Sequence, residues 1–126
     1  MPQTFNIESR GDYLSVSLGP DYAVSPAQEV EFWGTIKAAC EQHDCYRVLL
    51  EGFAPKRMPD ASEIVQSGLS ASEVGPKLWF AVCIDDLELS ELTELFKAVA
   101  RSRGVHVKFF DDRDHALMWL RSGSTD

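Results

Sequence analysis

Three cysteines are the strongest potential nucleophiles in this chain of 126 residues. Cys40, Cys45 and Cys83 form an odd set without a CxxC spacing, and two of them lie in segments with the pattern of core strands. A catalytic thiol needs a basic, partly exposed setting that lowers its pKa, and His43 is the single hint of such a setting near Cys40 and Cys45. We therefore expect buried, reduced thiols.

Carboxylates gather after two apolar segments. Asp85 and Asp86 follow the most apolar run, and parallel sheets place sites such as the acidic pocket of a phosphoacceptor receiver domain at the carboxyl ends of strands. The rest of the receiver pattern is missing, so we expect Asp86 to cap a helix and Asp85 to face solvent. A second group precedes the last amphipathic segment and comprises Asp111, Asp112, Asp114 and His115. Because consecutive acids at a helix start seldom converge on a divalent cation, no metal site is expected.

The chain has none of the short motifs that identify common enzymes. It lacks GxSxG, HExxH, Walker and GxGxxG patterns, and its three histidines are scattered over different segments. We therefore expect neither an enzymatic activity nor a cofactor. Catalytic triads assemble in space rather than along the chain, so an activity without a sequence motif stays open.

The composition indicates one soluble globular domain over residues 1–126, with 44% hydrophobic and 25% charged residues. The formal net charge of −8 argues against nucleic acid and anionic membranes as partners, because binding phosphates requires grouped Lys and Arg. A basic or neutral protein partner is compatible with it. The longest apolar stretch, residues 78–84, is too short to span a membrane, and the first four residues lack the pattern of a secretory signal. We therefore expect a cytoplasmic protein.

Hydrophobic periodicity predicts strands and helices in the order ββαβαβαβα. Residues 5–7 and 13–18 alternate apolar and polar side chains around a turn at 10–12, which predicts a hairpin. The other predicted strands cover residues 45–50, 77–84 and 105–110, and the predicted helices cover residues 26–43, 60 into the range 70–75, 87–103 and 111–121. The first helix should bury Val30, Trp33, Ile36 and Cys40 on one face. Trp119 lies near the edge of the apolar stripe of the last helix, and we expect it to be partly exposed.

The alternation of strands and helices implies parallel pairing through right-handed crossovers, whereas the first two strands can pair only antiparallel. The predicted fold is therefore a single α/β domain with a mixed sheet. Two prolines exclude regular structure from residues 54–59, so a loop leaves the carboxyl end of the third strand. Asp60 and Glu63 then have the spacing of a capping box at the start of the second helix.

The order of elements and several apolar segments resemble the STAS domain, the module shared by sulfate transporters and anti-sigma factor antagonists. The closest resemblance is to its small stand-alone relatives, the STAS/SEC14-like (SpoIIAA-like) proteins. It is carried best by the segments FAVCID at 80–85, LTELFK at 92–97, VKFFD at 107–111 and ALMWL at 116–120. This resemblance covers most of the chain and implies a small regulatory or binding module.

The resemblance also implies a regulatory serine. In the anti-sigma antagonists a phosphorylatable serine opens the second helix, in a pattern close to Met-Asp-Ser-Ser-Gly-Leu. The corresponding run here is Met58-Pro59-Asp60-Ala61-Ser62-Glu63, which makes Ser62 the candidate phosphoacceptor, with Glu63 in place of the glycine. The alternative is that Ser62 is a helix-start serine without a regulatory role.

Three functions follow as hypotheses. The first is a non-enzymatic STAS-like module that binds a protein partner through a surface made of Phe53, Lys56, Arg57, Met58, Asp60 and Ser62. The second is a carrier or sensor of a small apolar ligand, held between the sheet and the second and third helices in a cavity lined by Ile64, Leu69, Leu92 and Phe96. The third is a structural homodimer, with the hairpin edge or Trp119 at its interface.

Overall fold

The computed structural model describes residues 5–19, 26–53, 60–75, 78–85 and 91–122. The elements along the chain are β1 (Phe5–Ser9), β2 (Leu14–Leu18), α1 (Pro26–His43), β3 (Arg47–Phe53), α2 (Ala61–Val74), β4 (Trp79–Asp85), α3 (Glu91–Ser102), β5 (His106–Phe109) and α4 (Arg113–Ser122). This is the predicted order, and the α/β fold with a mixed sheet is confirmed.

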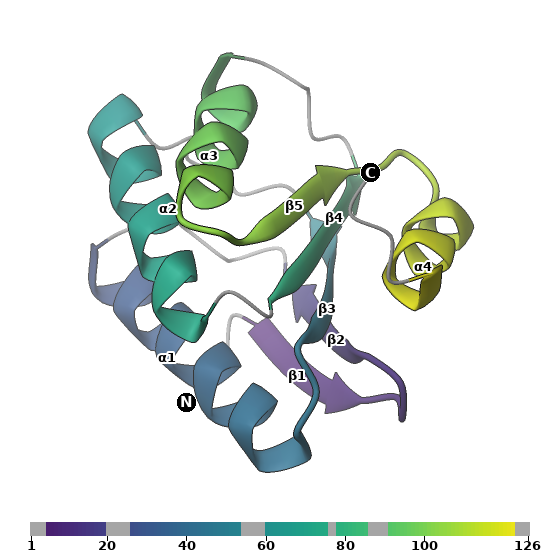
Figure 1. Cartoon of the computed structure of the whole chain (residues 1–126). Coiled ribbons are helices and arrows are strands. Elements are labelled where there is room, and N and C mark those ends of the chain that lie inside the picture. The colour runs from purple at the N-terminus through teal and green to yellow at the C-terminus, as the bar shows by residue number, and fades with distance from the viewer. Residues whose placement is uncertain (1–4, 20–25, 54–59, 76–77, 86–90, 123–126) are drawn as a thin grey trace.

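The five strands lie side by side in chain order, β1-β2-β3-β4-β5. β1 pairs antiparallel with β2, and the hairpin is closed by a hydrogen bond from Arg10 N to Tyr13 O of 2.8 Å. The other neighbours pair in parallel. Because each crossover is right-handed and steps to the next strand in the same direction, α1, α2 and α3 lie on one face of the sheet, and α4 lies on the opposite face (Figure 1).

Side chains that alternate along the strands fill two cores. The three-helix core lies between the sheet and α1, α2 and α3, and it includes the fully buried Val16, Val48 and Phe80. The α4 core lies on the other face and is smaller. It comprises Tyr13, Leu49, Ala81, Ala116, Leu117, Trp119 and Leu120, with Trp79, Cys83 and Phe110 packed against them.

The predicted bounds of α1 are confirmed, but its buried face is rotated from the predicted one. Val30 is 74% exposed, and Phe32, at 4%, joins Trp33, Ile36 and Cys40 in the three-helix core. Phe32 packs edge-on against Phe5 of β1, at 5.2 Å between ring centroids. At about 100° per residue, Val30 lies roughly 100° from the centre of this buried stripe. The prediction for Val30 was therefore wrong.

The prediction that Trp119 is partly exposed was also wrong. Its side chain is 8% exposed and lies 5.0 Å from the ring of Trp79 and 5.7 Å from that of Phe110. Trp79 stands on the face of β4 that α4 covers, so the last helix turns its own indole toward it. The neighbouring Met118 is exposed instead, at 67%. Trp119 is therefore not available as the exposed self-association patch that the homodimer hypothesis used.

Two glycines let elements approach more closely than other residues would allow. Gly52 of β3 has a φ of +117°, and a Cβ there would lie 2.3 Å from the carbonyl oxygen of Leu18 on β2. Gly68 lies where α2 meets α3, and a Cβ there would lie 2.7 Å from Cγ1 and 2.9 Å from Cβ of Val99. Such contacts are too short for a side chain, so both positions require glycine's missing Cβ.

Candidate functional site

The start of α2 is held by the predicted capping box. Asp60 has an extended backbone, and its Oδ1 accepts a hydrogen bond of 2.9 Å from the backbone N–H of Glu63. The carboxylate of Glu63 returns to accept one of 3.0 Å from the backbone N–H of Asp60. Two amides that the helix leaves without partners are thereby satisfied, which fixes this helix start in one conformation.

Ser62 is exposed in the first turn of α2, and its hydroxyl donates a hydrogen bond of 2.9 Å to Oδ1 of Asp60. The same oxygen atom therefore accepts from both Ser62 and Glu63. A phosphate on Ser62 would remove this donated proton and add a charge of about −2 between two carboxylates. The positive end of the α2 dipole would favour that charge, whereas the carboxylates of Asp60 and Glu63 would oppose it.

The structure places only part of the predicted binding surface. Asp60 and Ser62 lie together at the start of α2, and the backbone of Phe53 ends β3, paired with Asp85 of β4. Lys56, Arg57 and Met58, like the side chain of Phe53, lie outside the described residues. From Ser62 the exposed face of α2 continues to Val65, which is 36% exposed.

The residues of the predicted ligand cavity lie on α2 and α3, in and beside the three-helix core. Phe96 is 8% exposed, and its ring centroid lies 6.3 Å from that of Trp33, 6.3 Å from that of Phe80 and 6.5 Å from that of Phe109. Ile64 packs against the same core, and Leu69 and Leu92 are half-buried. Phe96 is thus surrounded by aromatic rings. A cavity among the four stays a prediction.

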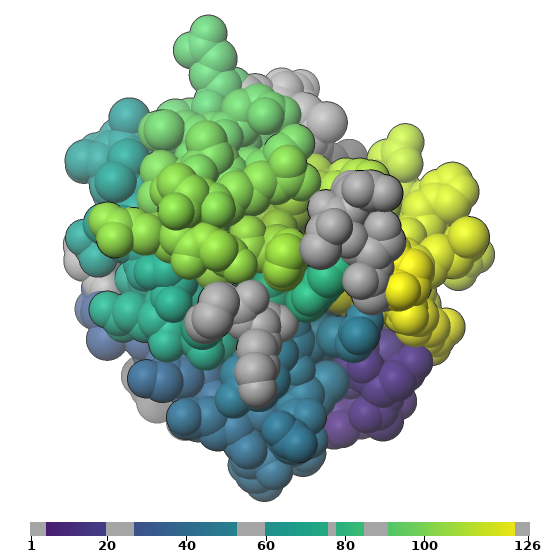
Figure 2. All heavy atoms as spheres, in the orientation of Figure 1, coloured from purple at the N-terminus to yellow at the C-terminus, as the bar shows by residue number. Residues whose placement is uncertain are grey.

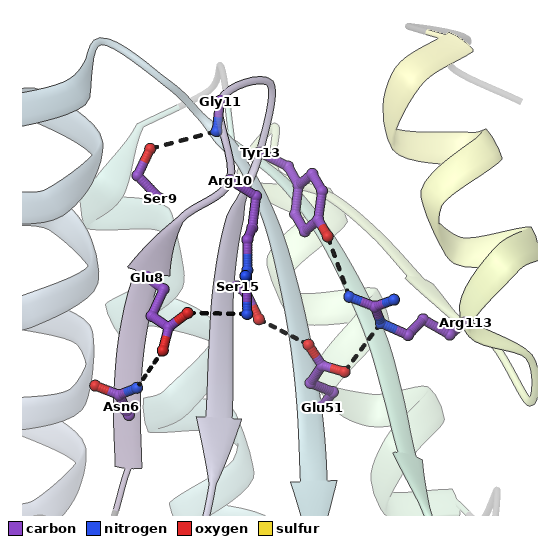
Figure 3. Close-up of polar contacts among 9 residues, drawn as sticks. All are labelled: Asn6, Glu8, Ser9, Arg10, Gly11, Tyr13, Ser15, Glu51 and Arg113. Atoms are coloured by element: carbon purple, nitrogen blue, oxygen red, sulfur yellow. Dashed lines mark hydrogen bonds and ion pairs between the residues drawn. The ribbon is translucent and has the colours of Figure 1, made fainter.

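A polar cluster on the α4 face of the sheet was not predicted. Oε2 of Glu51 accepts a hydrogen bond of 2.7 Å from the hydroxyl of Ser15, and Oε1 accepts one of 3.2 Å from Nε of Arg113. Nη2 of Arg113 donates to the hydroxyl of Tyr13 at 3.1 Å (Figure 3). These four residues, the Glu51 cluster, come from β3, β2, the start of α4 and the residue before β2.

The Glu51 cluster has the chemistry of a structural link. Ser15 is 3% exposed, and its hydroxyl proton is directed at a carboxylate that Arg113 already neutralises. Because both oxygen atoms of Glu51 are engaged, the cluster ties α4 to two neighbouring strands. One sequence signal was available, since the alternation along β2 turns Ser15 and Tyr13 to the face opposite Leu14 and Val16.

Cys40 has the opposite of a reactive setting. It is fully buried, and burial raises its pKa from 9.0 to about 12, with smaller contributions from the nearby Cys45 and Glu41. The thiol is therefore protonated at neutral pH. The expectation of a buried, reduced thiol is confirmed for Cys40, whereas Cys45 and Cys83 are half-buried thiols.

The acids before α4 act as a cap. Oδ1 of Asp112 accepts a hydrogen bond of 2.9 Å from the backbone N–H of Asp114, and Oδ2 lies 3.4 Å from Nδ1 of His115. Asp86 and the side chain of Asp85 lie outside the described residues, so the predicted cap there has no structural description. In the part of the chain that the structure describes, His, Cys, Asp and Glu form no group of three or more that could hold a metal ion.

Neither a protein-family model nor a curated protein matches the sequence. Among solved structures, two of Pseudomonas aeruginosa DspI are similar, with TM-scores of 0.45 and 0.48, sequence identities of 13% and 11%, and coverage of 67% and 96% of this chain. This chain spans 42% and 74% of those DspI chains. A probable enoyl-CoA hydratase from Mycobacterium thermoresistibile has a TM-score of 0.42 at 10% identity, and the match covers 94% of this chain and 78% of that one. Likenesses this distant carry no argument about activity.

None of the helices in the described ranges has the length and apolar character needed to cross a membrane.

Proposed function

We propose that this chain is a non-enzymatic, cytoplasmic, STAS-like module that binds a protein partner through the exposed start of α2. The observation that carries the proposal is the capped, exposed turn at Asp60 and Ser62. A surface that is already ordered loses little conformational entropy when a partner docks on it.

An apolar contact lies one turn further along α2. Val65 is 36% exposed, and residues three apart share a helix face, so Ser62 and Val65 form one surface. Gln66 beside them is exposed as well. A surface with an exposed valine between polar side chains is of the mixed kind found at the edges of protein interfaces. The carboxylates of Asp60 and Glu63 favour a neutral or basic partner surface there.

The non-enzymatic part of the proposal is supported by the state of the nucleophiles. Cys40 is protonated and buried, and the hydroxyl of Ser15 faces a carboxylate whose other oxygen atom is held by an arginine. The sequence also lacks the common catalytic motifs. The resemblance to STAS modules points to regulation in the same way.

Phosphorylation of Ser62 would act as the switch in this proposal. The modification would replace the donated hydrogen bond to Asp60 by repulsion between anions, and would add negative charge to the partner surface itself. A partner that accepts the uncharged serine would therefore be released.

The test is site-specific photo-crosslinking in cells of the native host. A crosslinking amino acid replaces Val65 in one variant and Met118 in a control variant, because Met118 is also exposed and apolar but lies on α4. The proposal is supported if a single protein adduct forms from position 65 and not from position 118. The adduct should also disappear when S62E is combined with the crosslinker at position 65. Equal adducts from both positions, or none from position 65, would contradict it.

Intact and native mass spectrometry of the protein from the same cells test the remaining parts. A mass gain of one phosphate that S62A abolishes supports the switch, and its absence under all growth conditions contradicts it. A small molecule retained only in the native spectrum would favour the apolar-ligand carrier, and a dimeric native mass would favour the structural homodimer.

A further inference from the structure

A hollow opens at the amino end of β5, away from the start of α2. Its volume is about 210 Å³, and it is lined by Arg101, Gly104, Val105, His106 and Trp119. These residues belong to the end of α3, the turn after it, the start of β5 and α4. Figure 2 shows the end of α3 and β5 on the face turned toward the viewer, so this part of the chain is at the surface.

Basic residues are concentrated in the segment that contributes Arg101 and His106 to the hollow, in a chain whose formal net charge is −8. Residues 95–110 contain no Asp or Glu, and they include Lys97, Arg101, Arg103, His106 and Lys108. Lys97 lies 3.8 Å from Glu94 in an ion pair, whereas the ion pairs between described residues include none of Arg101, Arg103 and Lys108. Cations at the end of α3 complement the helix dipole, but the dipole gives no reason for basic residues on β5.

Arg101 is held in place and retains donors. Its Nε and Nη2 donate hydrogen bonds of 3.2 and 3.0 Å to the carbonyl oxygen of Val107. A guanidinium has five N–H donors, so three remain after these two bonds. They include a pair at the end of the group, with the spacing that a carboxylate accepts with both oxygen atoms.

Two flat rings form part of the wall. His106 stacks on Trp79, with 4.4 Å between ring centroids and 27° between the planes. Trp119 lies 5.0 Å from the same indole and is 8% exposed. The rings are therefore fixed by packing. The half-buried His106 offers most of the ring surface, and Trp119 adds the small exposed part of its indole, so the wall suits a flat, apolar body.

We propose that this hollow binds a small organic carboxylate with a flat apolar body, such as an aromatic or conjugated acid. The carboxylate pairs with the free end of the Arg101 guanidinium, and the body lies against Trp119 and His106. The guanidinium of Arg101, which has no acidic partner among the ion pairs between described residues, supplies the attraction. The pairing with Val107 sets its direction. This inference concerns a surface other than the start of α2 and is independent of the proposed function.

The test is a titration of the whole ¹⁵N-labelled chain followed by two-dimensional NMR. The probes are benzoate, benzyl alcohol as the uncharged analogue, and inorganic phosphate as an anion without a flat body. Benzoate should give saturable shifts at the amides of Gly104, Val105 and His106 and at the indole of Trp119, with a Kd in the millimolar range expected for so small a ligand. Benzyl alcohol and phosphate should each bind at least about tenfold more weakly, because each lacks one of the two contacts.

Matched variants separate the site from general electrostatics. R101Q should weaken benzoate binding by about tenfold or more, because a charged hydrogen bond is lost. R103Q removes the same charge from a residue that does not line the hollow, and should change the Kd less than about twofold. The dispersion of each spectrum shows whether the variant is folded. If R101Q is unfolded, R101K takes its place. The same loss of benzoate binding is expected for R101K, because lysine cannot donate two parallel hydrogen bonds to a carboxylate. Equal losses in R101Q and R103Q, binding of benzyl alcohol or phosphate as tight as that of benzoate, or an absence of shifts with benzoate would overturn the proposal.

Discussion

Replacing the two glycines that lie inside helices by alanine should have opposite effects on stability. Gly34 lies in α1, is exposed, and has no atom within 4 Å of a Cβ built on it. Gly68 lies in α2, where the same atom would be 2.7 Å from Cγ1 and 2.9 Å from Cβ of Val99. The substitution is chemically identical at both sites, so the difference between them isolates the contact of α2 with α3.

The magnitude follows from two terms. Alanine is favoured over glycine inside a helix by about 1 kcal/mol, and G34A should gain most of that amount. Non-bonded carbon atoms lie about 3.5–4.0 Å apart, so in G68A the helices must separate by roughly 1 Å, and overpacking of this kind costs about 1–3 kcal/mol. Val99 is β-branched and stiff, so rotation of its side chain does not relieve the contact. We therefore expect the unfolding free energy of G68A to lie about 1–3 kcal/mol below that of G34A.

The assay is urea unfolding followed by far-UV circular dichroism, with the wild type and both variants measured at one pH. The double variant G68A/V99A provides the internal check, because V99A removes the contact of 2.7 Å with Cγ1 and leaves only the one of 2.9 Å with Cβ. Its unfolding free energy should be about 1 kcal/mol higher than the value obtained by adding the changes in G68A and V99A to that of the wild type. If G68A and G34A raise stability equally, the argument that α3 excludes a side chain at position 68 is refuted.

Three further substitutions test other parts of the fold. G52A should destabilise the chain by about 3 kcal/mol or more in the same urea assay, because it combines a φ of +117° with a Cβ 2.3 Å from the backbone oxygen of Leu18. A variant as stable as the wild type would contradict the close contact between β2 and β3 at this position. E51A should cost about 1–3 kcal/mol by leaving the hydroxyl of the buried Ser15 without its acceptor, and an unchanged urea midpoint would show that the Glu51 cluster adds nothing to stability. The pKa of Cys40 is raised from 9.0 to about 12 in the fold, so its contribution to stability is complete below pH 9.0 and is lost as the pH rises toward 12. C40A should therefore lose less stability than the wild type between these pH values, and parallel pH profiles would contradict the assignment.

The sequence was most informative where structure is decided locally. The capping box of Asp60 and Glu63, the hairpin turn and the glycine that ends α3 involve residues close together in the chain. The order of strands and helices followed from hydrophobic periodicity for the same reason. The crossover rule then converted that order into a mixed sheet, with parallel pairing after the first hairpin.

Errors arose where the answer depended on distant residues. The phase of the buried face of α1 depends on Phe5, which gives Phe32 a partner and leaves Val30 in solvent. Trp119 is buried because it packs against Trp79, which lies 40 residues earlier in the chain and on the face of the sheet that α4 covers. No pattern along the chain encodes either pairing.

The polar sites were harder still to find from the chain alone. Glu51 and Ser15 are 36 residues apart, and Arg113 reaches Glu51 from 62 residues away. The hollow beside Arg101 is likewise assembled from α3, β5 and α4. Single residues of these kinds are common on protein surfaces. These ones form a site only because the fold brings them next to residues that are distant in the chain.

The sheet has a consequence for how the chain reaches its native state during synthesis. Its strands lie in the order in which a ribosome makes them, so each new strand can pair with one already present at the growing edge. The three-helix core can be completed in the same sequence, crossover by crossover. The opposite face of the sheet is covered only once α4 has been made, because α4 is the helix that packs on Leu49 and Trp79 among the described residues. A nascent chain paused before α4 would therefore present a bare apolar surface, on which chaperones would be expected to act.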